Sequence, residues 1–213
     1  MEILLYTILR ALVVGIVISA PMGPVGVLCI QRTLNRGRLA GFYTGVGAAV
    51  SDLCYSLITC FGLTLIEGTL NENQDVIKLV GSLVLVAFGI YLFRKKPMPG
   101  INNEDRANTT PHSEILTGFL FTASNPLIIF LIIGVFARLN FLDTGMTWYH
   151  YLAGFIFIIA GALLWWWCIT WGVNKLRAHF NLRSMWLINR ITGSIILIFA
   201  IVGIFTSVNS MFL

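Results

Sequence analysis

Ser19-Ala20-Pro21-Met22-Gly23-Pro24 is the stretch that decides the fold of this chain of 213 residues. It interrupts an apolar run that extends from Ile3 to Ile30. A proline inside a helix lacks the backbone N–H and clashes with the preceding turn, and the residue before it is pushed out of the helical region. Inside a membrane-spanning segment, such backbone is tolerated only where protein buries it or where it lines a polar cavity. The stretch therefore predicts a broken transmembrane helix beside a cavity.

The composition indicates an all-α integral membrane protein surrounded by lipid. The chain is 57% hydrophobic and 11% charged, whereas about a quarter of the residues of a soluble domain are charged. Its net charge of +5 falls in short clusters between apolar runs and forms no basic face, so we expect no nucleic-acid partner. The first apolar run lacks the basic start of a cleaved signal peptide, and we expect it to be retained as a span.

Six apolar segments approach the length of about 20 residues that a helix needs to cross a bilayer. We expect these six transmembrane helices at residues 4–30, 40–66, 76–93, 115–138, 148–173 and 188–208. Eleven of the fourteen Lys and Arg residues occupy or border the first, third and fifth loops. They are Arg32, Arg36, Arg38, Arg94, Lys95, Lys96, Arg106, Lys175, Arg177, Arg183 and Arg190. The positive-inside rule then places these loops in the cytoplasm and both termini outside it.

The two halves of the chain share the interruption. Residues 15–24 run glycine, three bulky apolar residues, Ser19, alanine and a proline-containing break, and residues 118–126 repeat this order with Thr122 in place of the serine. Each half has three spans, an odd number, so the second half enters the membrane from the opposite side, as in the inverted repeats of many secondary transporters. We expect the first and fourth helices to be interrupted. The predicted units are a first repeat at 1–93, a cytoplasmic connector at 94–114 and a second repeat at 115–213.

Asp52 is the one acidic residue deep inside a predicted span. A charged side chain near the centre of a bilayer costs at least about 2.5–3.5 kcal/mol, and such residues often mark functional pathways. Three roles are open for Asp52: binding a substrate ammonium, carrying a coupling proton, or pairing with Arg10 to hold the bundle together.

The breaks themselves offer complementary groups. The exposed N–H groups at the start of a half-helix favour an anion such as a carboxylate, and the carbonyls freed before a break favour a cation. Ser19, Thr122, Ser124 and Asn125 add hydrogen-bonding groups at the same depth. Together with Asp52, they suggest a site for a zwitterion such as an amino acid.

Two further patterns each allow two interpretations. Trp165-Trp166-Trp167, shortly before Lys175, is typical of the aromatic belt at a membrane interface but would also suit a stacking platform for a ligand; we favour the belt. Gly37, Gly41 and Gly45 lie on one helix face and serve either close packing inside the chain or a homodimer contact.

These motifs resemble the LysE/RhtB family of amino-acid exporters. The resemblance is carried by Ser19–Gly26, Arg36–Phe42, Gly47–Asp52 and Gly118–Pro126, although Met22 widens the usual proline-glycine-proline motif. It implies a secondary transporter of the bacterial inner membrane rather than an enzyme, driven by proton exchange, with substrates including lysine, arginine, threonine and homoserine. Its motifs mark Pro21, Gly23, Pro24, Asp52, Asn125 and Pro126.

We therefore expect an amino-acid exporter that works by alternating access, with Asp52 as the proton-coupling residue and no cofactor or metal. The predicted substrate site comprises Ser19, Pro21, Gly23, Pro24, Asp52, Thr122, Ser124, Asn125 and Pro126. An alternative is a divalent-metal exporter of the same superfamily, which needs several ligands within the membrane. A membrane thiol oxidoreductase of the DsbD type requires a cysteine at each break, whereas Cys29 lies beyond the first break and the fourth span has no cysteine.

Overall fold

The computed structural model describes residues 2–21, 23–64, 74–94, 110–125, 127–139, 141, 147–176 and 182–212. These residues are almost entirely helical. Their helices are α1 (Glu2–Ser19), α2 (Pro24–Arg36), α3 (Arg38–Thr64), α5 (Gln74–Arg94), α6 (Pro111–Ala123), α7 (Leu127–Leu139), α8 (Trp148–Lys175) and α9 (Leu182–Phe212). The prediction of an all-α membrane protein is confirmed.

The first and fourth predicted spans are broken, as expected. The axes of α1 and α2 differ by 83°, and those of α6 and α7 by 76°. Pro24 occupies the first turn of α2, where its missing N–H removes no helical hydrogen bond. At the first break, the proline chemistry therefore ends one helix and starts the next. Met22 and Pro126, at the two breaks, lie outside the described residues.

The remaining spans are continuous helices. By length and composition, α3, α8 and α9 can each cross a membrane, and the two bent pairs bring the candidates to five. The described apolar part of α5, Lys78–Tyr91, is shorter than the others; it corresponds to the predicted third span, the shortest of the six.

Several predicted boundaries move. Helix α2 continues to Arg36, so Arg32 lies on a helix and not in the first loop. That loop reduces to Gly37, whose φ of 101° is the left-handed conformation that glycine adopts most readily. The last four residues assigned to the connector begin α6, and residues 95–109 of the connector lie outside the described part of the chain.

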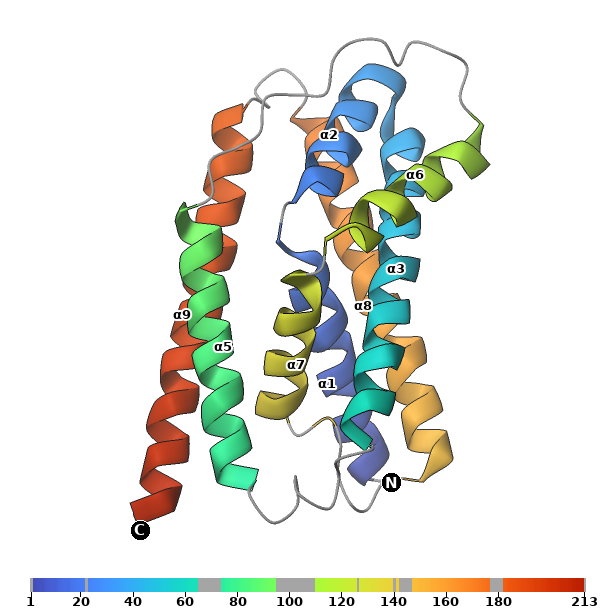
Figure 1. Ribbon diagram of the computed structural model, residues 1–213. Coiled ribbons are helices and arrows are strands. Elements are labelled where there is room, and N and C mark those ends of the chain that lie inside the picture. The colour runs from blue at the N-terminus through green and yellow to red at the C-terminus, as the bar shows by residue number, and fades with distance from the viewer. Residues whose placement is uncertain are drawn as a thin grey trace.

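The helices pair across the two halves of the chain (Figure 1). The start of α1 and the end of α9 lie at one end of the bundle, and α6 starts at the other end. Helix α1 packs against α8 and α6 packs against α3, while α5 pairs with α9. The first helix of each half therefore packs on the second span of the other half, in opposite directions, as an inverted repeat requires.

Glycines at these crossings let two backbones meet. At each one, an added Cβ atom would collide with a backbone carbonyl oxygen of the partner helix. The glycine and carbonyl pairs are Gly15 with Ile158, Gly161 with Leu12, Gly118 with Thr44, and Gly47 with Ile115. The same reciprocal contact thus occurs at both crossings.

These contacts define the register of the repeat. Adding 103 to a residue number in α1 gives its counterpart in α6, as Gly15 corresponds to Gly118. Adding 114 to a residue number in α3 gives its counterpart in α8, as Gly47 corresponds to Gly161. The first rule reproduces the alignment of the sequence motifs, and the second relates spans whose sequences show no evident motif.

The later halves of the broken helices depart from this symmetry. Helix α2 packs closely against α3, whereas α7 packs closely against α5. The corresponding α7–α8 and α2–α9 contacts are marginal or missing among the described residues. The two repeats therefore hold their broken helices in different arrangements.

Two of the three glycines of the predicted face, Gly41 and Gly45, are packed inside the chain. An added Cβ at Gly41 would collide with Thr33 of α2, and one at Gly45 would collide with the Trp166 side chain of α8. These two glycines pack the chain against itself, whereas an added Cβ at Gly37 would meet no described atom within 4 Å.

Candidate functional site

A cavity with about 430 Å³ of open space, its mouth included, lies where the two breaks meet. It sits between two hydrophobic clusters, one containing Ile18, Phe88, Ile128 and Leu131 and the other containing Trp166. The predicted site residues that line it are Ser19, Pro21, Gly23, Pro24, Asp52, Thr122 and Asn125.

Ser124, one of the predicted site residues, stands apart from this lining. Ser124 is exposed and its hydroxyl donates to the carbonyl of Leu120, one turn earlier, at 2.7 Å. Its side chain thus helps to end α6 and does not line the cavity. Pro126 lies outside the described residues.

Asp52 lies on α3 in the wall of the cavity and is only 2% exposed. The hydroxyl of Ser19 donates to its Oδ2 at 2.5 Å. This bond takes the place of the pair with Arg10 that the sequence left open. The other carboxylate oxygen, Oδ1, is buried without a hydrogen-bond partner among the described residues. A buried acceptor of this kind is costly unless something donates to it.

Two further polar groups in the cavity wall are also buried without a hydrogen-bond partner among the described residues. Trp166, on α8, is 1% exposed, and Thr122, on α6, is 4% exposed. Both line the cavity, and neither the Trp166 Nε1–H nor the Thr122 hydroxyl has a partner among the described residues. Trp167 and Trp171 are each 47% exposed. The belt interpretation is therefore wrong for Trp166, which faces the interior while its neighbour Trp167 lies on the outer surface.

The repeat register relates the two sides of the cavity. Adding 103 takes Ser19 to Thr122, and adding 114 takes Asp52 to Trp166. The next helical turn agrees with this register. Ser56 donates to the Asp52 carbonyl, and Thr170 donates to the Trp166 carbonyl, each at 2.8 Å. The cavity thus lies between two equivalent positions that carry different chemistry.

Helix ends add to the electrostatics of the site. Both α2 and α7 begin at the breaks, so the partial positive charge of a helix N-terminus is directed at this region from each half. Gly23, the residue before α2, makes no side-chain cap. The opposite end of the second break is held by Tyr55 on α3, whose hydroxyl donates to the Ala123 carbonyl at 2.5 Å. Sequence reasoning did not identify Tyr55.

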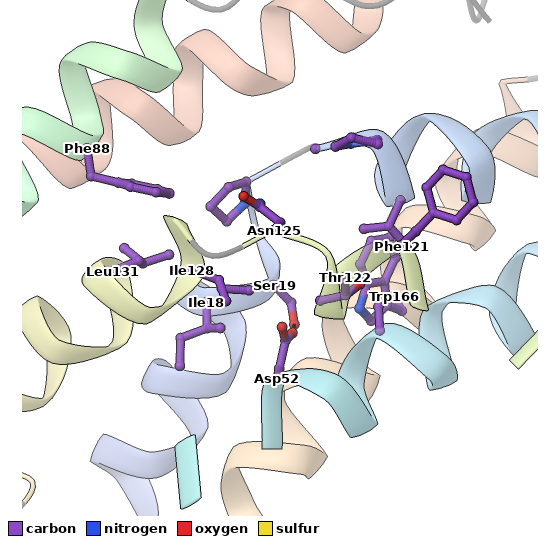
Figure 2. Close-up of a pocket in the computed structure, with 15 residues that line it drawn as sticks. Ile18, Ser19, Asp52, Phe88, Phe121, Thr122, Asn125, Ile128, Leu131 and Trp166 are labelled. Carbon is purple, nitrogen blue, oxygen red and sulfur yellow. Dashed lines mark hydrogen bonds between the residues drawn. The ribbon is translucent and has the colours of Figure 1, made fainter. Parts of the chain in front are cut away.

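The rest of the lining is apolar. In Figure 2, Ile18, Ile128, Leu131 and Phe88 lie on one side of the Ser19–Asp52 pair, and Thr122, Trp166 and Phe121 lie on the other. Asp52 is the one carboxylate among the described lining residues. Among the residues that the structure describes, no three His, Cys, Asp or Glu side chains lie close enough together to hold a metal ion.

A second polar cluster joins α2 to α3 and α6 away from the cavity. Arg32 is buried and donates to the hydroxyls of Thr44 and Thr117, each at 2.8 Å. One turn later, Arg36 forms an ion pair with the buried Glu114 at 3.6 Å. This cluster lies at the end of the bundle opposite the start of α1 (Figure 1). Sequence reasoning assigned both arginines to a loop because they are charged.

A family model described as LysE type translocator matches residues 16–206. The chain is 28% identical over 188 residues to "Putative amino acid efflux protein YcgF" of Bacillus subtilis (strain 168), which covers 87% of each protein. It is 26% identical over 175 residues to "Uncharacterized membrane protein YahN" of Escherichia coli (strain K12), covering 81% of this chain and 77% of that protein. No solved structure matches the chain significantly.

Proposed function

Because the chain belongs to the family of LysE type translocators, we propose that it exports amino acids from the cytoplasm and binds them in the cavity between its two broken helices. The observation that carries this proposal is the buried carboxylate of Asp52, which presents Oδ1 without a partner in the wall of that cavity. The similarity to a protein named for amino acid efflux supports the same class of substrate.

The proposed binding mode places the substrate ammonium on Asp52 Oδ1. Ser19 donates to Oδ2 and so holds the carboxylate in place without occupying Oδ1. The substrate carboxylate faces the N-termini of α2 and α7, where backbone N–H groups and the helix dipoles favour an anion. Asn125 lines the cavity at the second break and offers an amide donor there.

The apolar side of the cavity favours a neutral apolar side chain. Ile18, Ile128, Leu131 and Phe88 surround the space on that side. A lysine or arginine substrate would bury a second cation, and the described lining has no second carboxylate to pair with it. Burying an unpaired charge is far more costly than burying a methylene group. Of the substrates that the family resemblance implies, we therefore rank lysine and arginine below threonine and homoserine, and all four below leucine-like amino acids.

Export in this account is driven by proton antiport with alternating access. Asp52 exchanges a proton for the substrate ammonium, so the two ligands compete for one carboxylate. The half-helices of the two repeats, 1–93 and 115–213, move about the breaks while the α1–α8 and α3–α6 crossings stay packed, and the different packing of α2 and α7 represents one of the two end states. We place the protein in the bacterial inner membrane with both termini outside the cytoplasm, from the distribution of Lys and Arg.

An export assay in intact cells tests the proposal. Cells that express the wild type or Asp52→Asn are loaded with dipeptides, and extracellular amino acids are measured over time for a panel of leucine, methionine, phenylalanine, threonine, homoserine, lysine and arginine. Thr59→Val serves as a matched control, because Thr59 is a buried polar residue of the same helix that does not line the cavity. All three proteins are quantified in the membrane.

We expect the wild type and the control to export at least one amino acid, and Asp52→Asn to export at background rate at equal membrane abundance. If the wild type exports none of the panel, the proposed function is wrong. If Asp52→Asn exports as fast as the wild type, the transporter assignment stands but Asp52 is not its ammonium site.

A further inference from the structure

We propose that Trp166 and Thr122 form a second half-site in the cavity, which binds the carboxylate of the substrate. This inference rests on the proposed function and assigns the anionic end of the ligand to two side chains, in addition to the helix N-termini. Its polarity is opposite to that of Ser19 and Asp52, which hold the ammonium.

Trp166 and Thr122 occupy the positions equivalent to Asp52 and Ser19 in the other half of the chain. The backbone contacts at the two helix crossings relate Asp52 to Trp166 and Ser19 to Thr122. All four of these residues line the cavity. An inverted repeat brings equivalent positions of its two halves to opposite sides of one central site. A ligand that contacts Asp52 on one side of the site is therefore within the space that Trp166 faces from the other.

The hydrogen-bonding chemistry of Trp166 complements that of Asp52. The indole Nε1–H of tryptophan is a hydrogen-bond donor only, and an ionised carboxylate is an acceptor only. The repeat has therefore placed a donor on one side of the cavity and an acceptor on the other. A zwitterionic amino acid carries the two complementary groups on one carbon atom. The pair also fixes the orientation of the ligand, since a carboxylate facing Asp52 would meet a like charge.

The hydrogen-bonding groups of Trp166 and Thr122 are unmet within the described part of the chain. Both the Trp166 Nε1–H and the Thr122 hydroxyl are buried without a partner among the described residues. Such groups in native proteins are nearly always satisfied, by protein, water or ligand. Ser19 and Asp52 satisfy one another in part, whereas their counterparts Thr122 and Trp166 do not. The unmet donors lie in the cavity wall, where a ligand can accept from them.

The Trp166 side chain is also closely packed and almost fully buried. Gly45 of α3 lies against the start of the Trp166 side chain so closely that an added Cβ would collide with it. Thr170, one turn along α8, bonds to the Trp166 backbone carbonyl. A donor fixed in this way loses little conformational entropy when it binds a ligand. Trp166 is therefore suited to select a carboxylate.

The test measures whether the site distinguishes a carboxylate from a neutral group in the same position. The full chain is purified and reconstituted in liposomes, and exchange of a radiolabelled amino acid that the wild type exports is measured. Unlabelled amino acid and its amide, which keeps the ammonium but replaces the carboxylate by a neutral group, are compared as competitors. The readout is the ratio of the two inhibitory concentrations, which does not depend on the amount of folded protein.

Trp166→Phe removes the N–H and keeps an aromatic ring. Trp167→Phe is its matched control, since Trp167 is the adjacent residue and lies on the outer surface. Thr122→Val removes the hydroxyl at constant size, and Thr122→Ser keeps it. A hydrogen bond to a charged group corresponds to roughly a tenfold to hundredfold change in affinity.

We expect the preference for the amino acid over its amide to fall roughly tenfold to hundredfold in Trp166→Phe. Thr122→Val should also lower this preference, while Thr122→Ser and Trp167→Phe should keep the wild-type ratio of inhibitory concentrations. An unchanged ratio in Trp166→Phe, even with slower exchange, would overturn the inference and leave amino-acid transport intact. If the wild-type protein exchanges no amino acid, the proposed function fails, and the half-site fails with it.

Discussion

Replacing the crossing glycines by alanine tests the arrangement of the helices. At Gly15 the added methyl group would collide with backbone atoms of Ile158 and Ala162, and at Gly118 it would collide with backbone atoms of Thr44. A backbone cannot rotate away as a side chain can, so α1 must separate from α8, or α6 from α3. Overpacking of this kind costs about 1–3 kcal/mol.

A control variant isolates this cost. Gly172 lies in α8, and none of the side chains or other helices that the structure describes is within 4 Å of an added methyl group there. Alanine is favoured over glycine in a helix by about 1 kcal/mol, and this gain applies to all three variants. Gly15→Ala and Gly118→Ala should therefore each be less stable than Gly172→Ala by about 1–3 kcal/mol, and by similar amounts because their contacts are equivalent.

Reversible unfolding in mixed detergent micelles, followed by the loss of helical circular dichroism, measures the free energies. If Gly15→Ala or Gly118→Ala is as stable as Gly172→Ala, the backbones do not meet at that crossing, and the register that relates Asp52 to Trp166 loses its basis.

Three further predictions concern the breaks, the second polar cluster and coupling. Tyr55→Phe removes the hydroxyl that donates to the Ala123 carbonyl. It should lower the free energy of unfolding in the same micelles by about 1 kcal/mol. No loss of stability would mean that other contacts hold the end of α6. Glu114→Gln removes the negative charge paired with Arg36. It should lower the free energy of unfolding by about 1–3 kcal/mol, because both side chains are largely buried. A stability equal to that of the wild type would contradict this ion pair. Acidifying the outside of the cells should speed export by the wild type and have no effect on residual export by Asp52→Asn, as measured by the initial rate of appearance of amino acid outside.

The breaks and the gathering of residues around them could be predicted from the sequence, because proline has a local effect that the rest of the fold does not override. Two prolines and a glycine at residues 21–24 must end a helix wherever they occur. A carboxylate within an apolar run, as at Asp52, must likewise face the protein interior. These two constraints were enough to bring Ser19 and Asp52 into one predicted site.

Trp166 could not be identified in this way. Three adjacent tryptophans point to different sides of a helix, and the sequence does not state which of them faces the interior. The signal that identifies Trp166 is its correspondence to Asp52, and this correspondence rests on backbone contacts between glycines and a partner helix. No motif shared by α3 and α8 reveals that register.

The sequence pattern places Arg32 in a loop for a related reason, although it lies in α2. An arginine is assigned to solvent by its charge, yet here Thr44 and Thr117 accept hydrogen bonds from its guanidinium inside the bundle. These acceptors come from helices that are distant in sequence, so their proximity depends on the tertiary fold. The helix therefore continues through residues that the sequence assigns to a loop.

The most direct test of the account is an experimental structure of the protein with an exported amino acid bound. We predict density for one amino acid in the cavity between the breaks, with its ammonium within hydrogen-bond distance of Asp52 Oδ1 and its carboxylate beside Trp166 Nε1. An amino acid bound elsewhere, or bound in the cavity with its carboxylate towards Asp52, would contradict the account.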